Sequence, residues 1–481
     1  MVNEGFLSQR KRLDTLFYLT AAFALLGPSF GIPVTSGFTL TFFRLAFFVL
    51  LAGFIFRFVN TKSLEATYMY PIRWYIAFLC FWIVYAVLTL TWVIDMGKGI
   101  RYVVFLTNMI ALALSFPYFI RNESYYQKIT KVLFGVYTAI ILFAVFESVT
   151  LIHLPTSRAA DENVSDGVSA AVTSVFTNQN DLATCITLAL PFIAAAMIML
   201  PLSRKAKTAL YGVFILSGYV LFATGSRVNE LIVLPLIAVA LLILFWKSLD
   251  RSRFNLKSIR RNGFFLLLAV VLIQVMLATM LTPEGQRVVG DKLGSTSASL
   301  SDLHNAVSEE LVGEEGSGIA GQSGESITVR VNLLKHGFDF LVKSHFMGVG
   351  AGNIERWMHP SSDEYVSGNV NKENIHNWWA EILVNFGVVT FALYLSLYVW
   401  LLWRLWKLIS LKRSPHLSPY LRFGAVASLA AMTGYFFGGM AMSTAIHFTP
   451  MWISYGLALA VLVLGEHQNK QVEPKSISGS K

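Results

Sequence analysis

The sequence is poor in charge and almost lacks cysteine. Only 14% of its 481 residues are Asp, Glu, Lys or Arg, whereas a soluble globular protein carries about 25%. So few charges cannot cover a water-facing surface when 55% of the residues are hydrophobic. This excludes a nucleic-acid-binding protein in spite of the net charge of +10 and indicates an integral membrane protein. Cys80 and Cys185 lie in apolar runs and provide neither a disulfide framework nor a metal-ligand spacing.

Long apolar runs occupy most of the chain. A membrane-spanning helix needs about 20 mostly apolar residues. The runs are continuous and do not alternate as barrel strands do, so we expect helices. The sequence predicts an all-α polytopic membrane protein with about twelve transmembrane helices, at 16–34, 39–58, 74–93, 99–119, 131–152, 181–202, 208–224, 228–246, 263–281, 378–403, 421–441 and 449–464.

Basic residues are concentrated in alternate loops. With the N-terminus in the cytoplasm, the inner segments hold 26 Lys and Arg residues and the outer segments hold 11, and Arg44 lies within a span. This bias follows the positive-inside rule. An even number of spans then places both termini in the cytoplasm.

Two connections on the predicted outer side are long, at about 153–178 and at 282–375. The second is too long for an ordinary connection, and Ser326–Lys343 within it has apolar residues at helical spacing. We therefore expect an extracytoplasmic loop subdomain whose amphipathic helix lies on the outer membrane surface. The predicted parts are a membrane domain of nine helices (1–281), this loop (282–375), a membrane domain of three helices (376–466) and a cytoplasmic tail (467–481).

Arginines lie at the outer ends of several predicted spans. Arg227 occurs in the tight turn Thr224-Gly225-Ser226-Arg227, where its guanidinium would face the headgroup layer and match phosphate oxygens bidentately. The alternatives are that it snorkels to the interface or pairs with Glu230. Arg330, on the predicted surface helix, is by itself an ordinary solvated charge.

Arg44 and Arg101 lie within or beside predicted spans. An arginine within a membrane is costly and is usually paired or functional. Ion pairs with Glu147 or Glu381 are the structural alternative to a functional role.

His376 begins the tenth predicted span and is followed by Asn377, by two tryptophans and, one turn deeper, by Glu381. Tryptophans mark a membrane interface, so we expect His376 to lie level with Arg227. Nearby arginines would keep the imidazole neutral, as a general base requires. The alternative is a helix cap or an ordinary interface residue. Glu381 either orients the base or pairs with an arginine.

The remaining polar motifs carry weaker signals. Helix capping explains Asn180 in the run Asn178–Asp181. No strand precedes the glycine-rich run Gly348–Asn353, so we expect a tight turn there. His304 has no metal-ligand spacing, and no Asp-x-Asp pair occurs in an inner loop. The sequence therefore predicts no metal, no cofactor and no sugar-nucleotide chemistry, with the active face outward.

Four stretches together resemble the O-antigen polymerase and O-antigen ligase superfamily of bacterial membrane glycan enzymes, including teichuronic-acid-type polymerases. The likeness covers about 176–390 and the plan of twelve helices, and Gln179 stands where the family often has proline. The stretches are Phe176–Ala183 (F-x-N-P-N-D-L-A), Ala223–Arg227 (T-G-S-R), Arg330 with Gly348–Asn353 (R…G-x-G-x-G-N), and His376 with Asn377, Glu381 and Gly387 (H-N…E…G).

The resemblance implies an enzyme of the bacterial cytoplasmic membrane. Its substrate would be an oligosaccharide on undecaprenyl diphosphate, joined to an acceptor hydroxyl at the outer face with inversion. Arg227 and Arg330 would hold the diphosphate, and His376 would act as base. Other candidate substrate-binding residues are Arg101, Arg44, Asn180, Asn377 and Glu381.

We expect a polymerase of a lipid-linked surface polysaccharide, such as a teichuronic or capsular cell-wall polymer. Membrane lipid and a chain-length regulator are candidate partners. A ligase that transfers the finished polymer to a different acceptor shares the same motifs. A lipid-linked sugar flippase or transporter would need charges along a central path, but the mid-span charges are few and the arginines gather at one face.

Overall fold

Helices form nearly all of the described chain, which in this computed structural model comprises residues 4–35, 38–160, 171–249, 256–283, 285–287, 290, 322–358, 375–442 and 446–472. The side chain of Arg330, residue His304 and the tail from 473 onward lie outside the described residues. The α-helices are α1 (Glu4–Leu25), α2 (Phe42–Thr61), α3 (Arg73–Thr89), α4 (Met96–Phe119), α5 (Glu123–Thr150), α7 (Gln179–Met199), α8 (Arg204–Thr224), α9 (Leu234–Ser248), α10 (Leu256–Met280), α12 (Gln322–Lys343), α13 (Ile354–Met358), α15 (Trp378–Leu408), α16 (Pro419–Gly438) and α17 (Thr449–Val472). Short 3₁₀ turns occur at η1 (Thr67–Ile72) and η2 (Arg158–Ala160), and a π-helical turn, η3 (Val228–Val233), precedes α9.

Ten helices in the described part of the chain are long and apolar enough to cross a membrane. The prediction of an all-α polytopic membrane protein is confirmed, and each of the twelve predicted runs overlaps a helix. Two of these helices, α1 and α16, are not among the ten. Charged residues occupy the first half of α1, and small residues make α16 less apolar than its neighbours.

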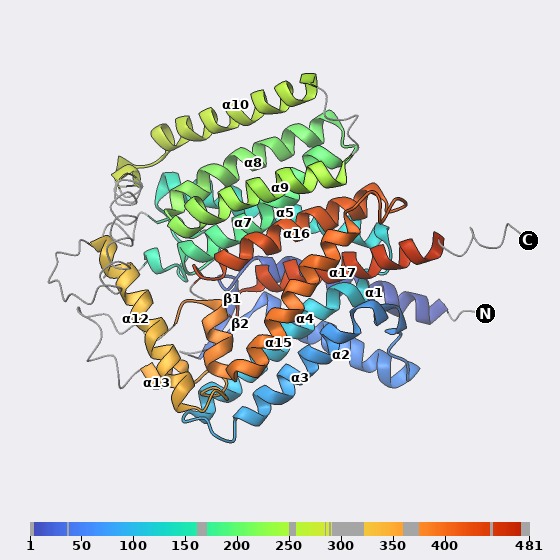
Figure 1. Ribbon diagram of the computed structural model, residues 1–481, viewed down its shortest axis with the longest axis vertical. Helices are drawn as coiled ribbons and strands as arrows, with labels where there is room; N and C mark the ends of the chain where they lie inside the picture. Colours follow the sequence, from blue (N-terminus) through green and yellow to red (C-terminus); the bar gives the residue numbers. More distant parts are fainter. Residues whose placement is uncertain are drawn as a thin grey trace, which may run out of the picture.

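Helix α16 lies in the middle of the bundle and packs against α7, α9, α15 and α17 (Figure 1). Its glycines and alanines let neighbouring helices approach closely, as small residues do in membrane bundles. A Cβ atom added to Gly424 would lie 2.6 Å from the Tyr126 hydroxyl, and one added to Gly434 would lie 2.7 Å from Ile237. The least apolar of the central helices is therefore also the one whose surroundings are entirely protein.

A β-hairpin occupies a region that the sequence assigned to the first two spans. Strands β1 (Gly31–Thr35) and β2 (Phe38–Thr41) pair antiparallel, with Gly31 opposite Thr41. The predicted spans 16–34 and 39–58 are wrong at these ends. The dipeptide at Gly27 and Pro28 ends α1, since a Gly-Pro pair is a strong helix breaker, and Pro33 is tolerated in an edge strand.

The two ends of the bundle differ in what they carry (Figure 1). The described parts near both termini lie at one end, which we call the terminal end, and α12 and α13 lie at the opposite end, which we call the α12 end. Helix α17 continues to Val472, so the predicted tail from 467 begins as helix. The assignment of the terminal end to the cytoplasm and the four-part division of the chain stay predictions.

Candidate functional site

The turn that carries Arg227 is tied to α7 by a buried asparagine. Gly225 ends α8 with a φ of +61°, a left-handed conformation that glycine adopts without strain. The amide of Asn229 donates to Ser226 Oγ at 3.0 Å and to Thr184 Oγ1 at 3.2 Å. Its carbonyl oxygen accepts from Thr187 Oγ1 at 3.1 Å. Asn229 is fully buried, Arg227 is half-buried, and the sequence analysis missed the role of Asn229.

The first turn of α7 is capped by a different residue from the one that we expected. The side chain of Asn178 accepts from the backbone N–H of Asn180 at 2.8 Å. Asn180 itself is half-buried, and its carbonyl accepts from Thr184 Oγ1. The assignment of the cap to Asn180 is therefore wrong by two residues, because the chain enters the helix in an Asx turn.

His376 lies just before α15 in a strained backbone conformation. Its φ is +49°, which is uncommon for a residue with a side chain. The cap of α15 is Asn377, whose Oδ1 accepts from the N–H groups of Trp379 at 3.0 Å and Ala380 at 3.2 Å. The structure therefore gives the capping role to Asn377 and leaves His376, which is half-buried, with another role.

The two tryptophans after Asn377 are buried, contrary to the expectation that they mark the interface. Trp378 is 0% exposed and Trp379 is 7% exposed. The indole N–H of Trp378 donates to the Tyr394 hydroxyl, and that of Trp379 donates to the Phe436 carbonyl. Because each indole N–H has a partner inside the bundle, burial costs little. These rings fix the start of α15 against α16.

Glu381 is buried and accepts a hydrogen bond of 2.7 Å from the Tyr102 hydroxyl. The expected ion pair between this carboxylate and an arginine is replaced by a neutral donor. Tyr102 follows Arg101 in α4, so the bond also ties the α12 end of α4 to the start of α15.

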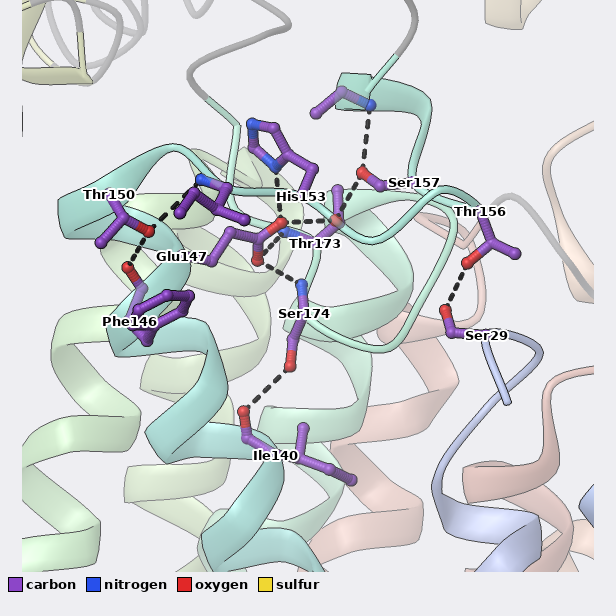
Figure 2. Close-up of polar contacts among 12 residues, drawn as sticks. Ser29, Ile140, Phe146, Glu147, Thr150, His153, Thr156, Ser157, Thr173 and Ser174 are labelled. Atoms are coloured by element: carbon purple, nitrogen blue, oxygen red, sulfur yellow. Dashed lines mark hydrogen bonds and ion pairs between the residues drawn. The ribbon is translucent and has the colours of Figure 1, made fainter. Parts of the chain in front are cut away.

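Glu147 is held at the α12 end of α5 by the loop that follows (Figure 2). Its Oε1 lies 2.7 Å from His153 Nδ1 and accepts from Thr173 Oγ1 at 2.9 Å. Its Oε2 accepts from the backbone N–H groups of Thr173 at 2.9 Å and Ser174 at 2.5 Å. The Ser174 hydroxyl in turn donates to the Ile140 carbonyl. This carboxylate therefore fixes the segment that leads into Phe176–Ala183 and is not the arginine partner suggested by the sequence.

Arg44, Arg101 and His447 form a cationic cluster at the α12 end. The Arg44 guanidinium lies 4.9 Å from the centre of the Phe105 ring, and the His447 ring meets the same ring edge-on at 4.1 Å. Burial, together with repulsion from Arg44 and then Arg101, lowers the pKa of His447 from 6.5 to about 4. The imidazole is therefore neutral at pH 7, and its ring remains exposed.

The sequence analysis missed His447. No motif surrounds this residue, and the only signal was its position just before the last span. Its proximity to Arg44 and Arg101 depends on how α2, α4 and α17 pack, and helical periodicity does not predict that packing.

The glycine-rich run Gly348–Asn353 docks onto the bundle as a turn, as expected, and does not form a phosphate loop. Gly387 breaks the helical path of α15 with a φ of +76°. Backbone bonds cross this break from Val349 N to Val384 O at 2.9 Å, from Gly350 N to Asn385 O at 3.0 Å and from Val388 N to Phe346 O at 3.1 Å. Since the glycine N–H groups are used in these bonds or point to neighbouring chain, the run holds α12 and α13 against α15.

Asn353 completes this docking by bonding both ways with Asp95. The backbone N–H of Asp95 donates to Asn353 Oδ1 at 2.8 Å, and Asn353 Nδ2 donates to the Asp95 carbonyl at 3.2 Å. The end of the run is thereby fixed to the cap of α4.

The end of α16 lies between the Arg227 turn and the start of α15. A Cβ atom added to Gly438 would lie 3.7 Å from Asn229 Oδ1, and one added to Gly439 would lie 3.3 Å from the Trp378 Cβ. The Gly439 carbonyl accepts from Trp378 N at 2.9 Å. The segments that carry Arg227 and His376 are therefore separated by one strand of backbone.

Helix α12 approaches from the other side of His376. A Cβ atom on Gly337 would lie 2.8 Å from Ile375, the residue before His376. Arg330 precedes Gly337 by two helical turns, about 10 Å along the α12 axis. Among the described residues, no group of three His, Cys, Asp or Glu lies close enough to hold a metal ion.

Comparisons with known proteins agree with this arrangement. Residues 212–395 match the family described as O-antigen ligase. The chain is also similar to the teichuronic acid biosynthesis protein TuaE of Bacillus subtilis (strain 168), with 24% identity over 476 residues, which cover 98% of this chain and 88% of TuaE. The matched family region includes the Arg227 turn, α12, the docked glycine run and the start of α15. The membership predicted from four short motifs is confirmed: the chain belongs to the O-antigen polymerase and ligase superfamily of membrane proteins.

Proposed function

We propose that the protein is a glycosyltransferase that polymerises a surface polysaccharide from glycans carried on undecaprenyl diphosphate. The coarse assignment, a membrane polysaccharide polymerase or ligase, follows from the family and the relative. The finer proposal rests on one observation. The end of α16 separates the Arg227 turn from the start of α15 by a single backbone strand, and α12 packs on the residue before His376.

In the proposed reaction, the acceptor hydroxyl attacks the anomeric carbon of the donor sugar. The new carbon–oxygen bond forms as the bond to the diphosphate oxygen breaks, and the diphosphate leaves with the electron pair. His376 takes the hydroxyl proton. Arg227 and Arg330 hold the diphosphate and stabilise the charge that it gains, and removing one such donor typically raises a barrier by about 3–4 kcal/mol. A single displacement of this kind inverts the anomeric configuration.

The second cationic cluster favours a polymerase over a ligase. A polymerase of lipid-linked units must accommodate two lipid diphosphates, one on the donor and one on the acceptor. Arg44, Arg101 and the neutral His447 lie on α2, α4 and the start of α17, apart from the Arg227 turn. We assign this cluster to the diphosphate of the acceptor. Regulation of chain length by a partner protein stays a prediction.

The test is reconstitution of the full chain in liposomes with a defined undecaprenyl-diphosphate oligosaccharide. A ladder of products from this one substrate is the expected result. Transfer only to an added second acceptor would identify a ligase, and movement of the lipid across the bilayer without new glycosidic bonds would identify a flippase.

His376→Ala separates catalysis from binding in the same assay. We expect the ladder to disappear while binding of the lipid donor stays within about twofold of wild type, since a general base contributes about 10²–10⁴-fold to rate. Loss of donor binding would instead make His376 a binding group.

A further inference from the structure

A basic cavity of about 430 Å³ lies at the terminal end, away from the site described above. It is enclosed by the start of α3, the end of α15 and the end of α17. One acidic residue, Glu466, contributes to its lining. The basic lining residues are Arg73, Arg404, Lys407, Arg413 and Lys470.

The only carboxylate in the lining is already engaged. Arg404 Nε and Nη2 donate to the same Glu466 oxygen at 3.0 and 2.6 Å. Arg404 is 9% exposed, so this pair is part of the wall and not a flexible surface contact. The other four basic side chains therefore give the cavity a net positive charge that its lining does not neutralise.

Aromatic rings hold two of these cations at the rim. The Arg73 guanidinium lies 4.1 Å from the centre of the Tyr70 ring, and Lys407 Nζ lies 3.0 Å from the centre of the Trp403 ring. A cation stacked on one ring face keeps donors for an anion on its other side. Trp74 and Trp403 are 55% and 48% exposed, at the ends of helices that can cross a membrane, where tryptophan anchors a protein in the headgroup layer.

We propose that this cavity binds the phosphate-bearing headgroup of an anionic phospholipid, as a site separate from the glycan chemistry. Its volume lies within the range of small-ligand sites, about 300–1,000 Å³. Excess cations select an anion, and exposed tryptophans beside them favour a ligand whose tail continues into the bilayer. Basic pockets between spanning helices on the inner side bind lipid headgroups in this way.

The experiment is native mass spectrometry of the full chain released from detergent after addition of phosphatidylglycerol or phosphatidylcholine. Wild type should retain phosphatidylglycerol in preference to phosphatidylcholine. The double variant Arg73→Gln with Arg413→Gln removes two exposed cations without touching the Arg404 pair. We expect it to retain phosphatidylglycerol about tenfold less well, because each basic group near a membrane surface contributes substantially to anionic-lipid binding.

Two matched variants control for total charge. Lys205→Gln with Lys207→Gln removes two exposed cations from the start of α8, outside the cavity lining, and should retain lipid as wild type does. Arg73→Lys with Arg413→Lys keeps both charges and should restore most of the retention. Equal loss in both Gln variants would overturn the proposal.

Inorganic phosphate provides the third comparison. Thermal stabilisation of wild type by phosphate that phosphatidylglycerol fails to displace would assign the cavity to a soluble anion and overturn the lipid assignment.

Discussion

The two ends of the bundle treat arginine in opposite ways. At the terminal end, Arg57 and Arg121 share Glu65, and Arg404 pairs with Glu466. At the α12 end, the two buried carboxylates are taken by other donors, Glu381 by Tyr102 and Glu147 by His153 and backbone N–H groups. Structural arginines thus lie with their counter-charges, whereas the α12 end keeps its carboxylates away from its arginines. A site for an anionic substrate requires that separation.

Arg227→Lys should have the largest effect, and it should fall on activity. A point charge lacks the planar fork that matches phosphate oxygens, so we expect polymer formation to fall by about 10²-fold or more with little change in the melting temperature. Product ladders and thermal unfolding of the same preparation measure both. Arg158→Lys, an exposed arginine beside the Ser157 turn, is the control and should retain activity.

Arg422→Lys should show the converse, a loss of stability with intact chemistry. The guanidinium of Arg422 is buried and donates to the carbonyls of Ile409 at 2.9 Å and Ser414 at 2.6 Å. Lysine cannot reach both, and each lost bond from a charged group costs about 1.5–3 kcal/mol. A lower melting temperature with normal turnover per folded molecule is expected. Reduced turnover without destabilisation would break the contrast between the two ends.

Glu147→Ala tests whether a carboxylate at the α12 end positions the loop. The change leaves the N–H groups of Thr173 and Ser174 without their acceptor, at a cost of about 1–3 kcal/mol each. We expect faster proteolytic cleavage at 151–178 and reduced activity. Glu147→Gln keeps one acceptor oxygen and should be intermediate, whereas equal behaviour of the two variants would argue against this role.

His447→Gln should have the smallest effect, visible mainly in pH dependence. The folded pKa of about 4 lies below the usual 6.5, so the unfolded chain binds more protons between these values. Stability should therefore fall as pH drops from 6.5 toward 4, and His447→Gln should flatten that slope. In the same variant, the KM for the acceptor should rise more than kcat falls. An unchanged slope would remove His447 from the cationic cluster.

Hydropathy predicted the spans well because a bilayer demands continuous apolar helices. It failed at residues 31–41, where the Gly-Pro pair and Pro33 outweigh an apolar composition and give a hairpin. It also did not reveal that α16 is central, because small residues matter through close packing and not through their transfer free energy.

The candidate site was predictable where function depends on a local motif. The Arg227 turn and the start of α15 follow from short sequence patterns, and the cap positions were off by one or two residues. Asn229, His447 and the partners of Glu147 and Glu381 depend on contacts between helices far apart in the sequence. The side chain of Arg330 lies outside the described residues, so its part in the site rests on the position of its helix.

The break in α15 at Gly387 links the long outer connection to a spanning helix. The amides of Val349, Gly350 and Val388 are bonded across that junction, so neither segment satisfies its own backbone. A chimaera that exchanged the outer connection between two relatives would therefore have to carry 346–388 as one unit. If the boundary fell inside that unit, the spanning helix would carry unmatched peptide groups.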